Sequence, residues 1–271
     1  MIAPSPNCAI LNFVTFEAVA ENLRESFRII ASSRVSGEVR ELPGVSIASA
    51  GVTFQMFNAA FLSGPVETEA ELSRNVLLPS LQFNTRGLEW SFWVCEDWLA
   101  PKAHRRLRQV FERHGLRRTV GLPGMVTEKV RPPARQLPEI EVRRVRDCRT
   151  ADDFRGIGSV CFHVPIVWFN EVFDQDSVWD RFASYVGYVD GEPVSTAATV
   201  ACGDTIGVYN VATLPDHQHH GYGEAVMRHA LTEAERERPS RAVVLQSTEA
   251  GLRLYERMGF RTVARFSVYA S

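Results

Sequence analysis

Short strand-like runs of hydrophobic and polar residues follow one another in the later half of the chain. Residues 184–189, 194–201 and 205–213 form three such runs and predict strands. Asp190-Gly191 lies between the first two, a dipeptide that favours the tight turn of a β-hairpin. The middle of the predicted sheet is therefore antiparallel.

Other stretches of the later half carry apolar residues at helical spacing. The strand predicted at 142–145 is followed by a helix that Thr150 caps and that has Phe154, Ile157 and Cys161 on one face. Further helices are predicted at 168–182, 222–235 and 251–258, and further strands at 241–246 and 262–269. This alternation indicates an α/β layer fold.

The earlier half has a weaker pattern. It begins with an amphipathic helix whose apolar face is made by Phe16, Val19, Leu23, Phe27 and Ile30. A hairpin is predicted within residues 43–60 and a strand at 88–94.

The two halves share one similar segment. Residues 108–117 read RQVFERHGLR and residues 252–261 read LRLYERMGFR, at a constant offset of 144 residues. This match indicates an internal duplication in which Phe111 stands at the position of Tyr255.

A proline-rich stretch at 128–139 separates the halves and predicts a linker. We therefore expect three parts, at residues 1–130, 131–138 and 139–271.

Composition and charge restrict the possible partners. The 271 residues include 30 basic and 32 acidic ones, a formal net charge of −2, without the broad positive field that nucleic acids or anionic membranes attract. No stretch of ~18 apolar residues predicts a membrane helix. The protein is thus expected to act in the cytoplasm, without nucleic-acid or membrane partners.

The cysteines form no motif. Cys8, Cys95, Cys148, Cys161 and Cys202 are an odd, scattered set without C-x-x-C, which favours reduced thiols over disulfides or a zinc site.

The segment YNVATLPDHQHHGYGE at 209–224 is the richest in candidate chemistry. A strand ends near Pro215, and Gly221-Tyr222-Gly223 then opens a helix whose free backbone N–H groups and dipole favour an anionic phosphate group. A dinucleotide-binding fingerprint is not expected, because Val226 stands where its third glycine is needed. His217, His219 and His220 come from a single loop, so a physiological metal site is not expected either.

Two motifs in this half resemble those of a known family. Gln218-His219-His220-Gly221-Tyr222-Gly223 is similar to the Q/R-x-x-G-x-G/A loop of GNAT acyl-CoA-dependent N-acyltransferases, and LYERMGF at 254–260 resembles the L-Y-x-x-x-G-F element of the same family. The resemblance covers residues 139–271. It implies a mixed, mostly antiparallel GNAT sheet flanked by helices, present twice, with a degenerate N-terminal copy.

The resemblance also implies roles for single residues. Tyr255 matches a tyrosine that acts as general acid and protonates the leaving thiolate of coenzyme A; the alternative is a packing role. The residues that would bind acetyl-CoA are Val211, Ala212 and Thr213 along the pantetheine arm, and Gln218, His219, His220, Gly221, Tyr222, Gly223 and Glu224 around the pyrophosphate.

Some positions depart from the family pattern. His219 and His220 replace the usual cationic residues, Thr248 stands near a position where asparagine is usual, and no acidic residue is placed as a general base.

The expected activity is transfer of an acetyl group from acetyl-CoA to an amine by direct attack in a ternary complex. A small-molecule acceptor is favoured over a protein, with the first half as a wall of its cleft; the alternative is a non-catalytic acyl-CoA-binding or interaction module.

Overall fold

The computed structural model describes residues 14–271 and contains a mixed α/β fold. Cys8 and the first 13 residues of the predicted 1–130 unit lie outside the described residues. The strands are β1 (Glu38–Leu42), β2 (Val45–Ser49), β3 (Asn58–Leu62), β4 (Ser91–Cys95), β5 (Arg117–Thr127), β6 (Glu141–Arg144), β7 (Ala183–Val189), β8 (Glu192–Cys202), β9 (Thr205–Thr213), β10 (Ala242–Gln246) and β11 (Arg261–Ala270). The helices are α1 (Phe16–Ser32), α2 (Glu69–Arg86), α3 (Pro101–His104), α4 (Leu107–Arg113), α5 (Cys148–Phe162), α6 (Ile166–Val172), α7 (Val178–Arg181), α8 (Tyr222–Glu237) and α9 (Glu249–Arg257), with 3-10 turns η1 (Gln55–Phe57), η2 (Glu96–Trp98) and η3 (Pro215–His217).

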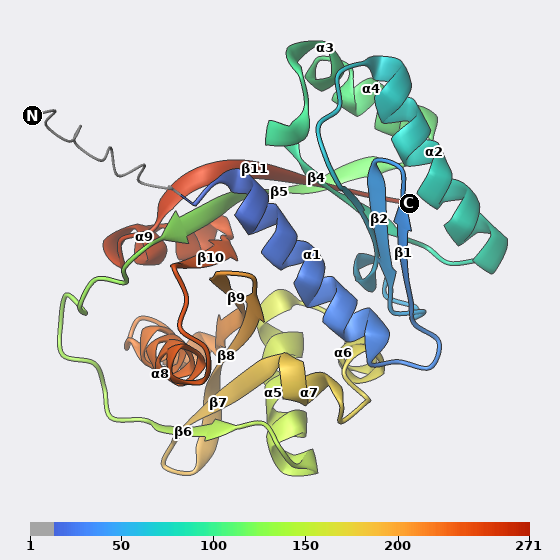
Figure 1. Ribbon diagram of the computed structural model, residues 1–271. Helices are drawn as coiled ribbons and strands as arrows, with labels where there is room; N and C mark the ends of the chain where they lie inside the picture. Colours follow the sequence, from blue (N-terminus) through green and yellow to red (C-terminus); the bar gives the residue numbers. More distant parts are fainter. Residues whose placement is uncertain (1–13) are drawn as a thin grey trace, which may run out of the picture.

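Within the described residues the strands form one sheet, in the order β1-β2-β3-β4-β11-β5-β10-β9-β8-β7-β6. Only β3–β4 and β9–β10 pair in parallel among them, and the other neighbours are antiparallel. The strands of the first half occupy one end of the sheet and those of the second half the other (Figure 1). The mixed, mostly antiparallel sheet flanked by helices is confirmed.

The halves exchange strands at the centre of the sheet. β11 of the second half lies between β4 and β5 of the first, so β5 lies between β10 and β11. The pairing of β5 with β11 is symmetric under the 144-residue offset: Arg117 faces Ala270, Val126 faces Arg261, and Leu122 faces Phe266, its own counterpart. An approximate two-fold axis therefore passes between Leu122 and Phe266.

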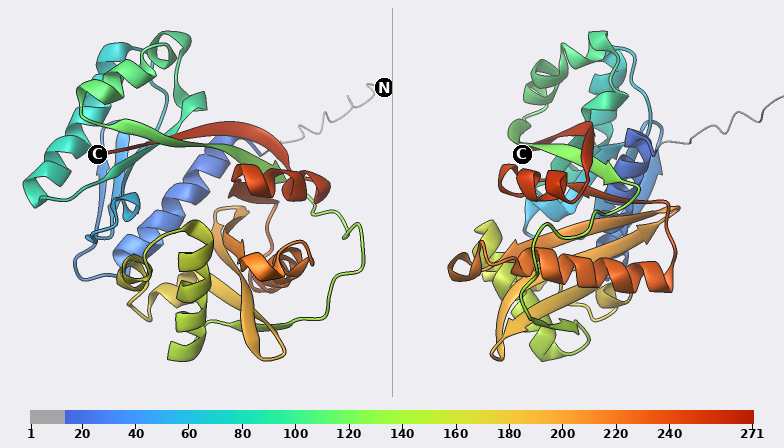
Figure 2. Two further views of the ribbon diagram at one scale, coloured as in Figure 1. Left: turned by 180° about the vertical axis from the view of Figure 1, so that it is seen from behind. Right: turned by 90° about the vertical axis from the view of Figure 1, so that its left-hand side faces the viewer.

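Helices cover both faces of the strands of the second half. Alternate residues of a strand point to opposite faces: Tyr185 packs in the core with α8, while its neighbour Val186 packs with α5. Helix α1 lies between the two halves and packs on strands of each (Figures 1 and 2). Its predicted apolar face is confirmed, since Val19, Leu23 and Ile30 are buried.

Most predicted elements are confirmed within a few residues, including the turn at Asp190-Gly191, where both residues have positive φ. The cap of α5 is a correction: Asp147 is the N-cap, and Thr150 is the N3 partner of a capping box. The helix predicted at 168–182 is two short helices, α6 and α7. The hairpin predicted within 43–60 is confirmed as the antiparallel pair of β2 and β3, and β1 adds a further strand to β2 through a turn at Pro43-Gly44.

The constant offset of 144 residues does not extend over the whole first half. Residues 76–82, one offset before the glycine loop, lie inside α2. The topological counterpart of the loop that precedes α8 is the loop of residues 63–68 that precedes α2. The 144-residue offset holds for the segment from α4 to β5, where no insertion separates the two halves, and fails further upstream.

Candidate active site

The sheet opens between β9 and β10. These parallel strands pair only as far as Val208 and Leu245, although β9 continues to Thr213. The predicted residues Val211, Ala212 and Thr213 therefore lie on a part of β9 that has no strand partner on the β10 side within the described chain. Backbone at an open strand edge can hydrogen-bond an extended ligand as a further strand would.

A bulge marks the start of this opening. Asn210 has a φ of +48°, and the register of β9 with β8 shifts between Thr196 and Ala198. Side chains of β8 replace backbone hydrogen bonds that the register shift removes between β8 and β9. Thr196 Oγ1 donates to the carbonyl of Asn210 at 2.8 Å, and Ser195 Oγ donates to the carbonyl of Ala212 at 2.7 Å. These contacts hold β9 to β8 while its other edge stays open.

The loop after β9 leads directly into the N-terminus of α8. Gly221 is the N-cap with a φ of +94°, which favours glycine, and no side chain caps the helix. The N–H groups of Tyr222, Gly223 and Glu224 belong to the first turn, where helices have no internal partners for them. Glu224 is the acidic residue of that turn, and Arg228 Nε donates to it at 2.9 Å. This end of α8 is arranged to receive an anion.

The remaining loop residues lie close to this end. Gln218 Nε2 donates to the carbonyl of Thr213 at 3.2 Å and so ties the loop to β9. His219 has a φ of +66°, and the ring of His220 stacks on that of Tyr222 at 5.8 Å between centroids. Gly223 allows α8 to approach β9, because a Cβ there would lie 2.9 Å from Thr213 Oγ1.

The linker crosses this loop, a contact that the sequence did not predict. Arg135 Nη2 donates to the carbonyl of His219 at 2.9 Å, and a Cβ on Gly221 would lie 3.3 Å from Pro138 Cδ. In the right-hand view of Figure 2 the linker runs in front of α8. Arg135 thus brings a cation to a loop that has histidines in its own cationic positions.

Tyr255 reaches the opening from α9. Its side chain is buried, and burial raises the pKa of its hydroxyl to about 12. That hydroxyl has no hydrogen-bond partner among residues 14–271. Thr248, which the sequence left without a role, is the N-cap of α9 and accepts from the N–H of Gly251.

Gln246 is a candidate residue that the sequence analysis missed. It ends β10 beside the opening, and its Nε2 is buried without a hydrogen-bond partner among the described residues. An unpaired buried amide is costly in a native protein, and such a group is often reserved for a ligand. No sequence motif distinguishes this glutamine from others.

A cavity of about 520 Å³ extends from the opening to the junction of the two halves. Asn210, Val211, Gln246 and Tyr255 line one end. The first half contributes part of the wall, from α1, the segment around η1, β4 and β5. The opening and the junction are therefore one continuous space.

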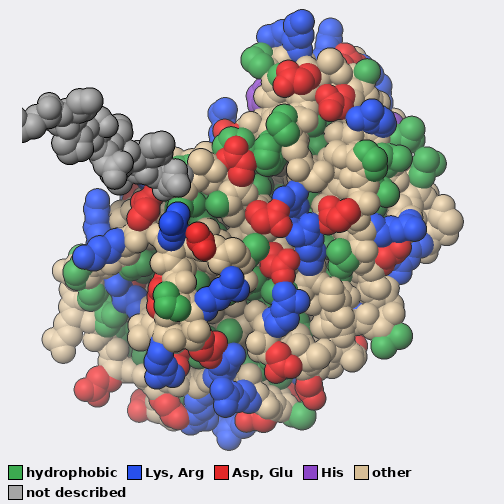
Figure 3. Space-filling view, in the orientation of Figure 1, with side chains coloured by type: hydrophobic (Ala, Val, Ile, Leu, Met, Phe, Trp, Pro, Cys, Tyr) green, Lys and Arg blue, Asp and Glu red, His purple; other side chains and the backbone are tan. Residues whose placement is uncertain are grey.

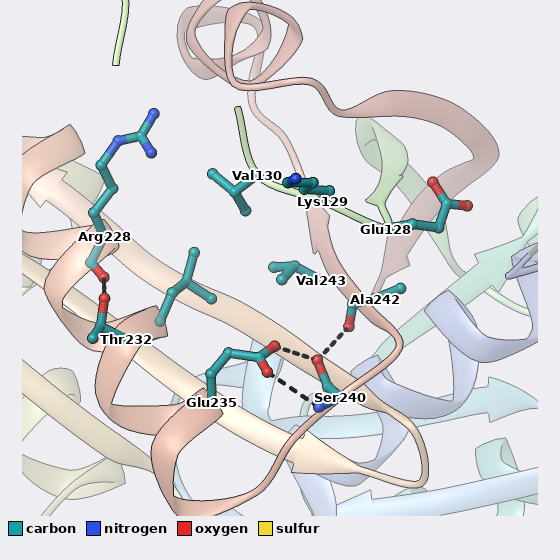
Figure 4. Close-up of a pocket in the computed structure, with 10 residues that line it drawn as sticks. Glu128, Lys129, Val130, Arg228, Thr232, Glu235, Ser240, Ala242 and Val243 are labelled. Atoms are coloured by element: carbon teal, nitrogen blue, oxygen red, sulfur yellow. Dashed lines mark hydrogen bonds between the residues drawn. The ribbon is translucent and has the colours of Figure 1, made fainter. Parts of the chain in front are cut away.

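A second cavity, of about 460 Å³, lies further along α8 (Figure 4). Its walls are the start of the linker, the middle and end of α8, and the start of β10. Glu235 on its wall already accepts hydrogen bonds from Ser240 and lies 14 residues from Gly221, about 21 Å along a helix. This cavity is separate from the anion site.

The first half lacks a comparable opening among its described residues. Val66 N–H donates to the carbonyl of Trp98, and Ala100 N–H donates to that of Val66, so the chain itself closes the gap beyond β3 and β4. The Thr68 side chain caps α2 by accepting from the N–H of Glu71, whereas no side chain caps α8. Phe111, the counterpart of Tyr255, is fully buried against Phe92 and Tyr269.

Three of the described cysteines, Cys95, Cys161 and Cys202, are not activated. Burial raises the pKa of Cys95 to about 12 and also raises the pKa values of Cys161 and Cys202.

Within residues 14–271 no group of three or more His, Cys, Asp or Glu side chains is arranged to hold a metal ion. In the same residues no helix is both long enough and apolar enough to cross a membrane. Acidic and basic side chains are interspersed over the face in Figure 3.

The fold and the site define an α/β protein whose sheet splits beside an uncapped helix N-terminus. Residues 180–262, from α7 to the start of β11, match the model of the acetyltransferase (GNAT) domain. The chain therefore contains an acetyltransferase domain of the GNAT type. No curated protein matches the chain.

Solved structures with the same fold cover nearly the whole chain. A GCN5-related N-acetyltransferase from Kribbella flavida is 18% identical with a TM-score of 0.70, over 93% of this chain and 95% of that one. A functionally unknown conserved protein from Staphylococcus epidermidis is 13% identical with a TM-score of 0.61, over 86% and 92%. A GNAT-family acetyltransferase, described as putative, from Novosphingobium aromaticivorans is 13% identical with a TM-score of 0.56, over 94% and 97%. At these identities the likeness concerns the fold, and it includes the first half.

Proposed function

We propose that the protein is an N-acetyltransferase that transfers the acetyl group of acetyl-CoA to a primary amine by direct attack in a ternary complex. The observation that carries the proposal is the continuity of three features: the open edge of β9, the uncapped N-terminus of α8, and the Tyr255 hydroxyl beside the opening. The pantetheine arm would follow Val211, Ala212 and Thr213, and the pyrophosphate would accept hydrogen bonds from the loop that ends at Glu224.

The linker would supply the charge that the loop lacks. Arg135 is placed by its bond to His219, and a guanidinium donates strong hydrogen bonds to phosphate oxygens. An Arg135→Ala variant is therefore expected to bind acetyl-CoA about tenfold more weakly, the loss of roughly one charge-assisted contact. Arg131→Ala, in the same linker, is the comparison.

In the chemical step the lone pair of the amine nitrogen forms a bond to the thioester carbonyl carbon, and the π electrons of the carbonyl bond move onto its oxygen. Gln246 Nε2 is the free donor proposed to stabilise that oxygen. The C–S bond then breaks with its electron pair on sulfur, and the thiolate takes the proton of the Tyr255 hydroxyl. The extra proton on the new amide nitrogen passes through water to the Tyr255 oxygen, which restores the hydroxyl. Although burial weakens Tyr255 as an acid, the same apolar surroundings raise the pKa of the departing thiol.

The halves are proposed to be two copies of one ancestral GNAT unit, at 1–130 and 139–271 and joined by 131–138, of which the first lost its coenzyme site. The symmetric pairing of β5 with β11 and the parallel pair in each half support the duplication. The closed gap and the side-chain cap of α2 support the loss of the site. We place the enzyme in the cytoplasm, where acetyl-CoA and reduced thiols occur together.

Calorimetric titration with acetyl-CoA and a thiol-release assay over a panel of amines test the proposed function. Binding together with amine-dependent release of coenzyme A is the expected result, and it should be accompanied by the acetylated amine in mass spectra. Binding without turnover on any amine would instead support a non-catalytic acyl-CoA-binding module. Absence of binding would overturn the proposal.

A further inference from the structure

The cavity between the halves has an unusual lining. Of the 22 described residues that line it, ten are aromatic and none is Asp, Glu, Lys, Arg or His. Its titratable groups are the hydroxyls of Tyr209 and Tyr255, and burial raises both pKa values. Tyr209 also donates a 2.7 Å hydrogen bond to Asn22 Oδ1. Neither hydroxyl can take a proton from an ammonium group at neutral pH.

This lining restricts the amine. An alkylamine with the pKa of a lysine side chain, ~10.4, is neutral in only about one molecule in 2,500 at pH 7. Its charged form would lose its hydration in the cavity without a carboxylate to pair with. An amine bonded to an aromatic ring is neutral at this pH, because its lone pair is delocalised into the ring, and it needs no base before it attacks.

The walls also suit a flat apolar body. Phe27 has ring centroids 5.6 Å from Phe57 and 5.2 Å from Trp93, and Phe54 stacks on Trp168 at 5.0 Å. Aromatic rings pack favourably edge to face or offset at such separations. Phe27, Phe54, Phe57 and Trp93 all line the cavity and come from the first half.

The segment at 162–169 extends the apolar surface outward. Phe162, Val164 and Phe169 line the cavity, while Ile166 and Val167 between them are 45% and 62% exposed. Exposed apolar residues beside a cavity are typical of the entrance to an apolar site.

We infer that the acceptor is a neutral aromatic amine whose ring lies in the cavity between the two halves. The inference rests on the proposed function and adds the class of acceptor to it. The first half then serves as the wall that selects the acceptor.

The test compares 4-ethylaniline with 4-ethylcyclohexylamine, which are similar in size but differ in basicity. With acetyl-CoA at saturation, kcat/KM for the aromatic amine should be at least about tenfold higher at pH 7 and nearly constant between about pH 6 and pH 9, above the pKa of the aromatic amine. A higher kcat/KM at pH 7 for the saturated amine would overturn the inference, because it would indicate an ammonium held by the ring faces. Binding of acetyl-CoA with no reaction of the aromatic amine would also overturn it, whereas failure to bind acetyl-CoA would overturn the proposed function itself.

Variants of the wall give an independent readout. Phe54→Leu removes a ring from the cavity, and Met56→Trp, from the same segment, fills it. Both are expected to raise KM for the aromatic amine about fivefold or more while the Kd for acetyl-CoA stays unchanged. Phe111→Leu, which removes a ring from the core of the first half outside the cavity, should leave KM unchanged. An unchanged KM in the folded wall variants would contradict the inference.

Discussion

The ring of Tyr255 lies directly over the bare Cα of Gly251, one helical turn earlier in α9. A Cβ at residue 251 would be 2.8 Å from Cε2 of the tyrosine, which is closer than carbon atoms normally approach. The glycine therefore determines where the ring can lie, and through the ring it determines where the hydroxyl lies in the opening.

Gly251→Ala should displace the Tyr255 hydroxyl without removing it. We expect kcat to fall about tenfold, since catalytic groups tolerate little misplacement, with little change in acetyl-CoA affinity. Gly156→Ala is the matched control, because a Cβ at that helical position meets nothing within 4 Å. The control should keep full activity and gain up to ~1 kcal/mol of unfolding free energy from better helix propensity. Equal kcat in both variants would show that Gly251 does not position the tyrosine.

Tyr255→Phe should affect only the chemical step. It removes the hydroxyl but almost no packing volume, so thermal stability and acetyl-CoA binding should stay near wild type. General acid catalysis is worth ~10²–10⁴-fold, and we expect a loss of roughly 10²-fold in kcat. Single-turnover measurements see the transfer without product release. The proposed acid role is falsified if their rates match wild type.

Gln246→Leu tests the buried amide that has no partner. The loss of a donor to the developing oxyanion should lower kcat about tenfold or more, without a change in the Kd for acetyl-CoA. Removal of an unpaired buried amide should not lower the unfolding free energy, because that group costs ~1–3 kcal/mol where it is. Denaturant melts and steady-state kinetics measure the two effects. A destabilised variant with normal kcat would assign Gln246 a structural role only.

Gly221→Val should abolish tight acetyl-CoA binding. The residue has a φ of +94°, and a Cβ there would approach the linker at Pro138 and Arg135. A β-branched side chain would strain the loop and also block the approach of the pyrophosphate to the backbone. Calorimetry should show a Kd at least about 10²-fold weaker, while circular dichroism retains the spectrum of the fold. A folded variant with unchanged Kd would rule out this anion site.

One coenzyme should bind per chain. The gap beyond β3 and β4 is closed by Val66 and Ala100, and the Thr68 side chain occupies the N–H of Glu71 in the first turn of α2, so the described part of the first half lacks the open strand edge and uncapped helix of the second. Calorimetric titration should give a stoichiometry of one. Phe111→Tyr in a Tyr255→Phe background should restore no activity, because residue 111 is fully buried. Two equivalent sites would overturn this view of the first half.

The sequence predicted the second half better than the first for a physical reason. Asp190-Gly191 determines a turn locally and marks the end of β7 and the start of β8. Burial does not distinguish the halves, because β2 and β3 in the first half and the central positions of β7 and β8 in the second are all buried without alternation. The strand exchange depends on pairing between residues about 144 apart, which no local pattern encodes.

The site divides in the same way. The glycines at the start of α8 belong to a short sequence motif, so their place at the helix N-terminus could be predicted from that motif. Arg135 and Gln246 act through their position in the fold, and the aromatic wall is assembled from segments that span residues 27–255. The absence of a charged residue in the cavity could not be predicted, because it is a property of the assembled surface.

The exchange of β5 and β11 has a consequence for biosynthesis. A nascent chain that has left the ribosome as far as residue 127 already contains β4 and β5, but the strand that belongs between them is residues 261–270. Until residues 261–270 have been synthesised, β4 and β5 have open edges that can pair with other chains. Their native pairing with β11 joins residues that are distant in sequence and therefore forms late. Translation as far as β11 must therefore precede completion of either half of the sheet, and the two halves expressed as separate polypeptides would each lack a central strand.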